Sequence, residues 1–88
     1  MTDQSFGMLA AFRSRQQAMH FASAMRQLGA ATSAGTTPSR IAAGCGISIR
    51  FGAGELSKAR SLLRSGGYGS LIGIFKADEG YRRVGFTR

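Results

Sequence analysis

The stretch Ile47-Ser48-Ile49-Arg50-Phe51 alternates between apolar and polar side chains, which is the period-two pattern of a β-strand. Ser48 and Arg50 fall on one face of this strand, and the aliphatic side chains fall on the other. A strand needs a hydrogen-bonded neighbour, and the nearest candidate is the segment 31–36, which contains only Ala, Thr, Ser and Gly. We therefore predict a hairpin in which residues 31–36 form a weak edge strand.

Four further segments flank this hairpin. Met8–Phe12 is a short apolar run that fits a central strand better than a helix. A Ser and a Gln at capping-box spacing open an amphipathic helix that we expect over residues 14–28. Apolar side chains recur at helical spacing in residues 55–64, and residues 71–75 form another apolar strand.

This order of elements, β-α-β-β-α-β, predicts a ferredoxin-like fold of the α+β class, with an antiparallel sheet and two helices on one face. The first and third strands are central in that topology, and the segment 31–36 is at an edge. Nothing repeats and no linker divides the chain, so residues 1–88 are expected to form a single domain. Residues 77–88 would add a hairpin strand or pack as a loose tail on the surface.

The charges of the chain are strongly unbalanced. Twelve Lys and Arg residues stand against four Asp and Glu, which leaves a formal net charge of +8. A field of this sign attracts nucleic acid, an acidic protein or an anionic surface. No apolar run approaches the ~20 residues of a membrane-spanning helix, and the first residues lack the features of a signal peptide. We therefore expect a cytoplasmic protein with no membrane partner.

The residues available for catalysis are few. One cysteine, Cys45, and one histidine, His20, cannot form an intramolecular disulfide or supply the ligands of a zinc site, so we expect no metal and no other cofactor. His20 falls on the polar face of the first helix, which favours a solvated surface histidine over a base for Cys45. The carboxylates lie at a terminus, a helix start and a turn, so no general acid and base pair is expected.

The connection that ends at Cys45 is long for two paired strands, and long ordered loops tend to be functional. Gly44 and Gly46 leave the sulfur uncrowded and permit neighbouring amides to point at an anion. Arg40 and Arg50 could add positive charge. Each feature favours the thiolate over the thiol. The alternative is that Cys45 is a small buried apolar residue at the start of a strand.

Several of these residues match the pattern of a known family. Phe12-Arg13-Ser14 leads into a helix with Ala18-Met19, and Pro38 stands seven positions before Cys45. Cys45-Gly46 then opens the strand that ends in Arg50-Phe51. In these features, from Met8 to Phe75, the chain resembles the selenium/sulfur carrier-like proteins, which are small domains of formerly unknown function.

The chain departs from that pattern in the polar residues of the motif. Residues 15–17 are Arg, Gln and Gln, where family members usually carry Thr and a His or Asp. The arginine that normally follows the proline directly is displaced to Arg40, and residues 42–44 are Ala, Ala and Gly in place of Ser-rich residues.

The resemblance implies a carrier or binding module rather than a turnover enzyme. Cys45 would hold a persulfide or selenium adduct and pass it from a donor protein to an acceptor protein. The residues that would stabilise the thiolate or belong to the motif around it are Pro38, Arg40, Gly44, Gly46 and Arg50.

The alternative function is a basic interaction module that binds nucleic acid or an acidic protein, with Cys45 buried and inert. RNA-recognition domains with this fold stack bases on strand aromatics, whereas residues 46–51 offer Ser and Arg on one face and aliphatic side chains on the other, so the stacking platform is absent. We expect weak nucleic-acid binding at most. The edge segment 31–36 invites pairing with another chain, so we expect either a partner chain there, as in a homodimer through this strand, or poor order in the segment.

Overall fold

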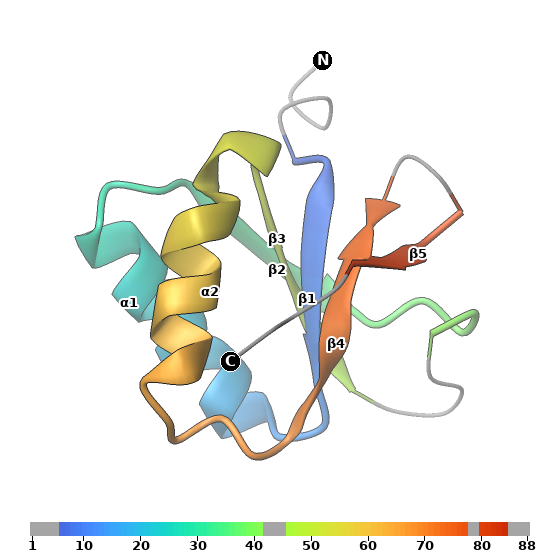
Figure 1. The fold of residues 1–88 in the computed structure, drawn as a ribbon. Coiled ribbons are helices and arrows are strands. Elements are labelled where there is room, and N and C mark those ends of the chain that lie inside the picture. The colour runs from blue at the N-terminus through green and yellow to red at the C-terminus, as the bar shows by residue number, and fades with distance from the viewer. Residues whose placement is uncertain (1–5, 42–45, 78–79, 85–88) are drawn as a thin grey trace.

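The computed structural model describes residues 6–41, 46–77 and 80–84 (Figure 1). Each predicted helix and strand is present, with boundaries within one residue of the predicted range. A short 3-10 turn, η2, precedes the second helix. The elements are β1 (Met8–Phe12), α1 (Arg15–Gln27), β2 (Thr32–Thr36), β3 (Ile47–Phe51), η2 (Ala53–Glu55), α2 (Leu56–Arg64), β4 (Leu71–Lys76) and β5 (Arg82–Val84).

The five strands form one antiparallel sheet in the order β2-β3-β1-β4-β5. Both helices lie on the same side of this sheet (Figure 1). The α+β, ferredoxin-like prediction is therefore confirmed, with β1 and β3 in the interior of the sheet and β2 at an edge. The tail supplies an additional strand, because β5 pairs with β4 in the register Ile74↔Val84.

Helix α1 begins and ends where its sequence indicates. The Ser14 hydroxyl accepts a hydrogen bond from the backbone N–H of Gln17 at 3.2 Å, which satisfies one of the free amides of the first turn. Gly29 follows the helix with φ of +90°, a left-handed conformation that glycine adopts without strain. The buried side chains of α1 are Ala18, Phe21, Ala22 and Met25.

Aromatic rings fill the core between the helices and the sheet. The Phe12 ring centroid lies 5.3 Å from that of Phe21 and 5.9 Å from that of Tyr68. Phe21 also meets Phe51 edge-on at 6.3 Å. Phe12, Phe21 and Phe51 have no exposed surface, so this cluster joins α1 to β1, β3 and the start of β4 through apolar burial.

The other face of the sheet carries a smaller core of Leu9, Ala11 and Phe75, packed against the partly buried Ile41, Ile72 and Tyr81. Ser48, expected among the polar residues of an open face, is 1% exposed. Its hydroxyl lies 2.8 Å from that of Thr37, so the segment after β2 covers the centre of this face. In the described residues, no helix is long and apolar enough to cross a membrane.

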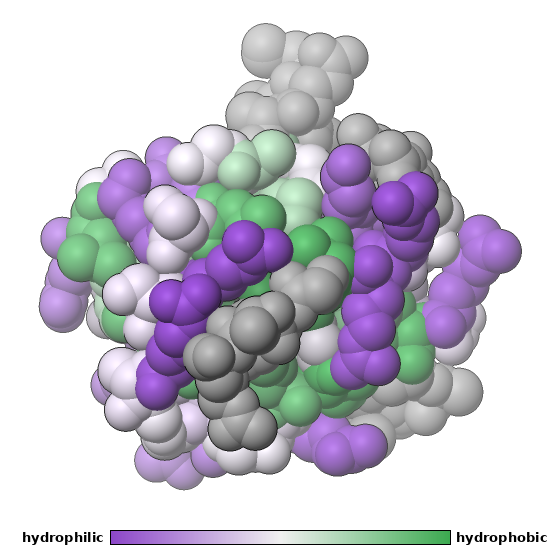
Figure 2. Space-filling view, viewed as in Figure 1, coloured by the Kyte–Doolittle hydropathy of each residue, from purple (hydrophilic) through white to green (hydrophobic). Residues whose placement is uncertain are grey.

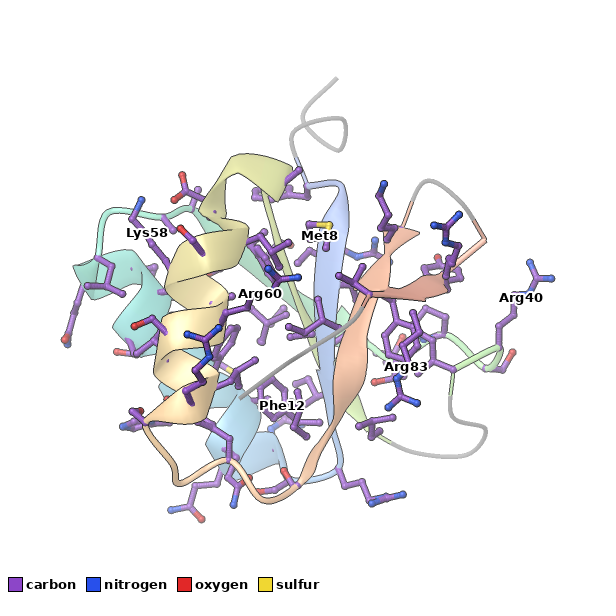
Figure 3. The ribbon with its side chains drawn as sticks, viewed as in Figure 1. Met8, Phe12, Arg40, Lys58, Arg60 and Arg83 are labelled. Carbon is purple, nitrogen blue, oxygen red and sulfur yellow. The ribbon has the colours of Figure 1, made fainter. Side chains whose placement is uncertain are left out.

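Arg83 covers the remaining part of this face near β4. Its guanidinium donates a hydrogen bond to the Ile72 carbonyl and lies 5.8 Å from the centroid of the Phe75 ring. A Cβ at Gly73 would lie 2.9 Å from the Arg83 Nη2 atom, so a larger residue there would displace the guanidinium from this position. Figure 3 shows Arg83 beside β4. Phe75 is consequently 8% exposed and offers little surface for stacking a base.

Candidate functional site

The residues that precede the predicted thiol form a turn. The Ile41 N–H donates to the Pro38 carbonyl at 2.9 Å, which closes the turn from Pro38 to Ile41. Cys45 and Gly44 lie outside the described residues, so their predicted roles stay predictions. The structure describes the chain again from Gly46, where β3 is about to begin.

Gly46 occupies a confined position. The Thr37 N–H donates to the Gly46 carbonyl at 3.4 Å, which continues the pairing of β2 with β3 by one residue. The φ of Gly46 is +117°, and a Cβ there would lie 3.0 Å from the Thr37 Oγ1 atom and 3.1 Å from the Phe12 carbonyl oxygen. Both the backbone conformation and the available space therefore require glycine at this position.

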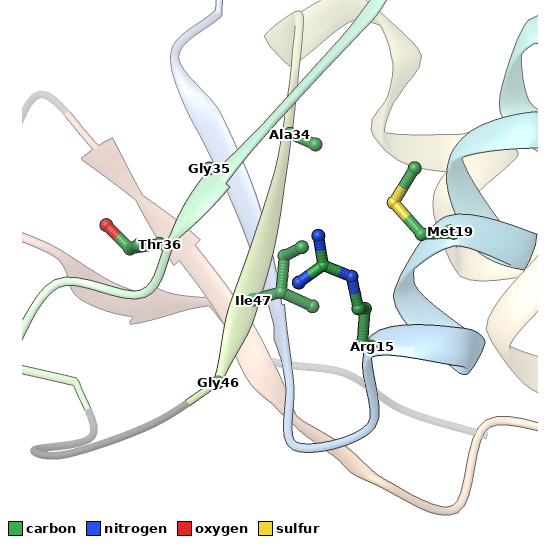
Figure 4. A pocket seen from close by; sticks show the side chains of 7 residues that line it. All are labelled: Arg15, Met19, Ala34, Gly35, Thr36, Gly46 and Ile47. Atoms are coloured by element: carbon green, nitrogen blue, oxygen red, sulfur yellow. The ribbon is translucent and has the colours of Figure 1, made fainter.

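A groove of about 330 Å³ opens beside Gly46. It lies between the first turns of α1 and the edge of the sheet, where the small side chains of β2 leave space (Figure 4). The guanidinium of Arg15 extends from α1 toward Ile47 (Figure 4). The lining residues are Arg15, Met19, Ala34, Gly35, Thr36, Gly46 and Ile47.

Arg40 and Arg50, the cations predicted to surround the thiol, are not among the lining residues of this groove. Arg40 is exposed, and its Nη1 atom lies 3.6 Å from the position of a Cβ at Gly80. Figure 3 shows its side chain extending away from the sheet. Arg50 lies opposite Leu9 in the β1–β3 register and is four residues beyond Gly46, about 13 Å at ~3.3 Å per strand residue.

Arg15 is the site residue that sequence reasoning missed. It lies in the segment 15–17, where the chain departs from the family pattern that it otherwise resembles. A cation in the first turn of a helix opposes the helix dipole, so its position is not explained by helix stability. The signal that could have identified it is the capping motif, which places Arg15 at the start of α1, next to the end of β1.

A second polar cluster joins α1 to the segment before β4. The Tyr68 hydroxyl lies 2.7 Å from His20 Nδ1, and the Ser70 N–H donates to Gln17 Oε1 at 2.9 Å. His20 is exposed, as predicted, but its ring is hydrogen-bonded to the hydroxyl of the buried Tyr68. A hollow of about 400 Å³ beside these groups is lined by Ser14, Gln16, Gln17, His20 and Gly67.

Tyr68→Phe should lower the free energy of unfolding at neutral pH by about 1 kcal/mol, because the hydrogen bond to His20 is lost. Burial raises the pKa of the Tyr68 hydroxyl above its ordinary value of 10.0. An unfolded tyrosine therefore ionises first, and this contribution to stability is complete below pH ~10 and lost as the pH rises through the folded pKa. Denaturant unfolding between pH 9 and 11 should show that the free energy of unfolding falls more steeply with pH for the wild type than for Tyr68→Phe. Equal slopes would contradict this assignment.

A basic surface lies at the opposite edge of the sheet. Figure 2 shows hydrophilic side chains over α2 and over β4 and β5, with hydrophobic surface between them. A hollow of about 400 Å³ there is lined by Met8, Ala53, Leu56, Lys76, Arg82, Arg83 and Val84. Among the residues that the structure describes, no cluster of three His, Cys, Asp or Glu could hold a metal ion.

The family described as "Putative Se/S carrier protein-like" matches residues 7–70, which are 64 of the 88 residues and include both sides of the groove. No curated protein and no solved structure matches the chain.

Proposed function

The chain belongs to the selenium/sulfur carrier-like family, and on this premise we propose that it is a carrier that holds sulfur or selenium on Cys45. The observation that carries the proposal is the extent of the family match, which includes Cys45-Gly46 and the elements around the groove. Gly46 follows Cys45 directly in the chain, so a groove lined by Gly46 begins one residue from the thiol-bearing residue.

The proposed transfer is a thiol–persulfide exchange. The Cys45 thiolate attacks the terminal sulfur of a donor persulfide, the donor S–S bond breaks, and the donor leaves as a thiolate. Cys45 then carries the terminal sulfur and its proton as a persulfide. An acceptor thiolate repeats the exchange and regenerates the Cys45 thiolate, so no external oxidant or reductant is consumed.

Positive charge supports this chemistry because the thiolate is the attacking form. Arg15 is the cation that lines the groove beside Gly46, so we assign it the main electrostatic role. Arg40 and Arg50 do not line the groove, and Arg50 lies farther from Gly46 than the Debye length of ~8 Å at physiological salt, so we assign both a smaller role. Pro38 accepts the hydrogen bond that closes the turn before the motif, and Gly44 stays a predicted member of the motif.

Cys45→Ser should abolish sulfur loading and leave the melting temperature near that of the wild type. Incubation with inorganic polysulfide, followed by intact-mass measurement, should show the gain of sulfur in the wild type only.

Arg15→Gln should slow alkylation of Cys45 by iodoacetamide at neutral pH, because less thiolate would be present. Arg13→Gln removes the same charge two residues away and should leave the alkylation rate near that of the wild type.

Two outcomes would overturn the carrier proposal. Cys45 could prove inaccessible to iodoacetamide in the folded chain, or Cys45→Ser could chiefly lower the melting temperature. Either result would make the residue part of the core, and the chain would then act as a basic interaction module.

A further inference from the structure

Strand β2 is an edge strand that lacks the features that usually prevent pairing with a strand of another chain. Within the described ranges its hydrogen-bonded neighbour is β3 alone, and the register runs without a bulge from Thr32↔Phe51 to Thr36↔Ile47. Its sequence, Thr-Ser-Ala-Gly-Thr, has no charged residue and no proline, the features that commonly block pairing at an edge. Four of its five residues are exposed. This edge can accept another strand.

The hydrogen-bond pattern shows which backbone groups of β2 face outward. Thr37 donates to Gly46, so Thr37 and Gly46 form a hydrogen-bonded pair. Such pairs alternate with non-bonded pairs in an antiparallel ladder, which directs the backbone groups of Ser33 and Gly35 toward β3. The N–H and C=O groups of Thr32, Ala34 and Thr36 therefore point to the open side.

Apolar surface lies along the same edge. Met19, which lines the groove, is 43% exposed and is one of the two exposed large hydrophobic side chains in the part of the chain that the structure describes. Met19 lines the groove together with Ala34 and Ile47 (Figure 4). An apolar side chain from a strand added to β2 could enter the groove, because alternate side chains of that strand would face α1.

Positive charge lies at both ends of the edge. Arg15 is in the groove beside Ile47, near the end of β2. Arg26 donates a hydrogen bond to the Thr32 hydroxyl at 3.3 Å, at the start of β2. Both guanidinium-bearing residues are exposed. A strand with acidic residues at its ends and apolar residues between them would complement this edge in charge and in shape.

We propose that an extended acidic segment of a partner protein pairs with β2 and places an apolar side chain in the groove. The inference rests on the proposed function for the identity of the partner, which would be a sulfur donor or acceptor. A strand added here lies about 4.8 Å from β2 and passes the end of β2 that pairs with Ile47, the residue after Gly46. Docking would thus bring the partner close to the residue that follows Cys45.

A second copy of this chain fits the edge less well. Antiparallel pairing of two β2 strands about a two-fold axis would place Arg15 of one copy near Arg26 of the other. Each copy also carries a net charge of +8. Repulsion between like charges at both ends of the interface opposes this dimer, whereas an acidic segment would be attracted to the same arginines.

The test uses two labelled, capped peptides of alternating valine and threonine, one with glutamate at both ends and one with lysine. Fluorescence anisotropy at low salt should show binding of the acidic peptide only. Arg15→Glu should weaken that binding about tenfold and strengthen binding of the lysine peptide. Arg13→Glu changes the net charge equally outside the groove and should have a much smaller effect.

Ala34→Pro tests the strand pairing itself. Proline removes an outward N–H while the Ser33 and Gly35 bonds to β3 remain, so the fold should survive and acidic-peptide binding should fall about tenfold or more. The melting temperature checks the fold, and Arg15→Glu remains as the decisive variant if Ala34→Pro unfolds.

The proposal would be overturned if neither peptide bound, or if Arg13→Glu and Arg15→Glu weakened binding equally. Light scattering that shows a dimer disrupted by Ala34→Pro would assign the edge to a second copy. Loading from inorganic polysulfide needs no partner strand. A chain that loads sulfur but binds neither peptide would therefore retain the proposed function and contradict only the docking proposal.

Discussion

Phe12→Ala should lower the free energy of unfolding by about 3–5 kcal/mol, because a fully buried ring would be replaced by a cavity. Phe12 contacts the rings of both Phe21 and Tyr68, so its loss removes packing from α1 and from the segment before β4. The total stability of a chain of 88 residues is about 4–13 kcal/mol. A large fraction of the variant should thus unfold well below the wild-type melting temperature.

Thermal and urea unfolding, monitored by circular dichroism, would measure this loss. Leu28→Ala is the matched control, because it also truncates a large apolar side chain but at a position that is 48% exposed. We expect the control to change stability by less than about 0.5 kcal/mol. Similar losses in the two variants would show that the ring cluster is not the centre of the core.

Gly46→Ala should lower the free energy of unfolding by about 2 kcal/mol or more. Alanine at φ of +117° strains the backbone, and its Cβ would lie 3.0 Å from Thr37 Oγ1 and 3.1 Å from the Phe12 carbonyl oxygen. The strand edge and the end of β1 would have to shift to accommodate it. The groove beside Gly46 would change shape at the same time.

Gly35→Ala is the matched control for this substitution. A Cβ at Gly35 would meet no atom within 4 Å, and no positive φ is involved. Alanine there should be neutral or stabilise by up to about 1 kcal/mol, because it restricts the unfolded chain. Urea unfolding of both variants measures the difference. Equal effects would show that Gly46 is replaceable, and the account of the confined loop end would then be wrong.

Much of the fold could be predicted from local patterns. The alternation in residues 47–51, the capped helix α1 and the apolar runs of β1 and β4 each report which side chains are buried, because periodicity follows directly from helix and strand geometry. The segment 31–36 lacks large side chains to cover a sheet face, which favours a position at the edge. The structure forms β2 there.

The candidate site was less accessible to the same reasoning. Proximity to Cys45 in the sequence points to Pro38, Arg40, Gly46 and Arg50, and only Gly46 among these lines the groove. Arg15 reaches the groove from 31 positions away in the chain, through the pairing of β1 with β3 and the turn into α1. The spacing of residues along the sequence does not indicate this contact, because it depends on how β1, β3 and α1 are packed together.

The sequence by itself determined the order of elements, the helix faces, the edge position of β2 and the family to which the chain belongs. The tertiary structure alone decided that Ser48 is buried beneath Thr37, that Tyr68 bonds His20, and that Arg83 covers β4. The physical reason is the range of the interactions. Burial periodicity is repeated along each element, whereas a single hydrogen bond or ring contact depends on how distant elements are paired and packed.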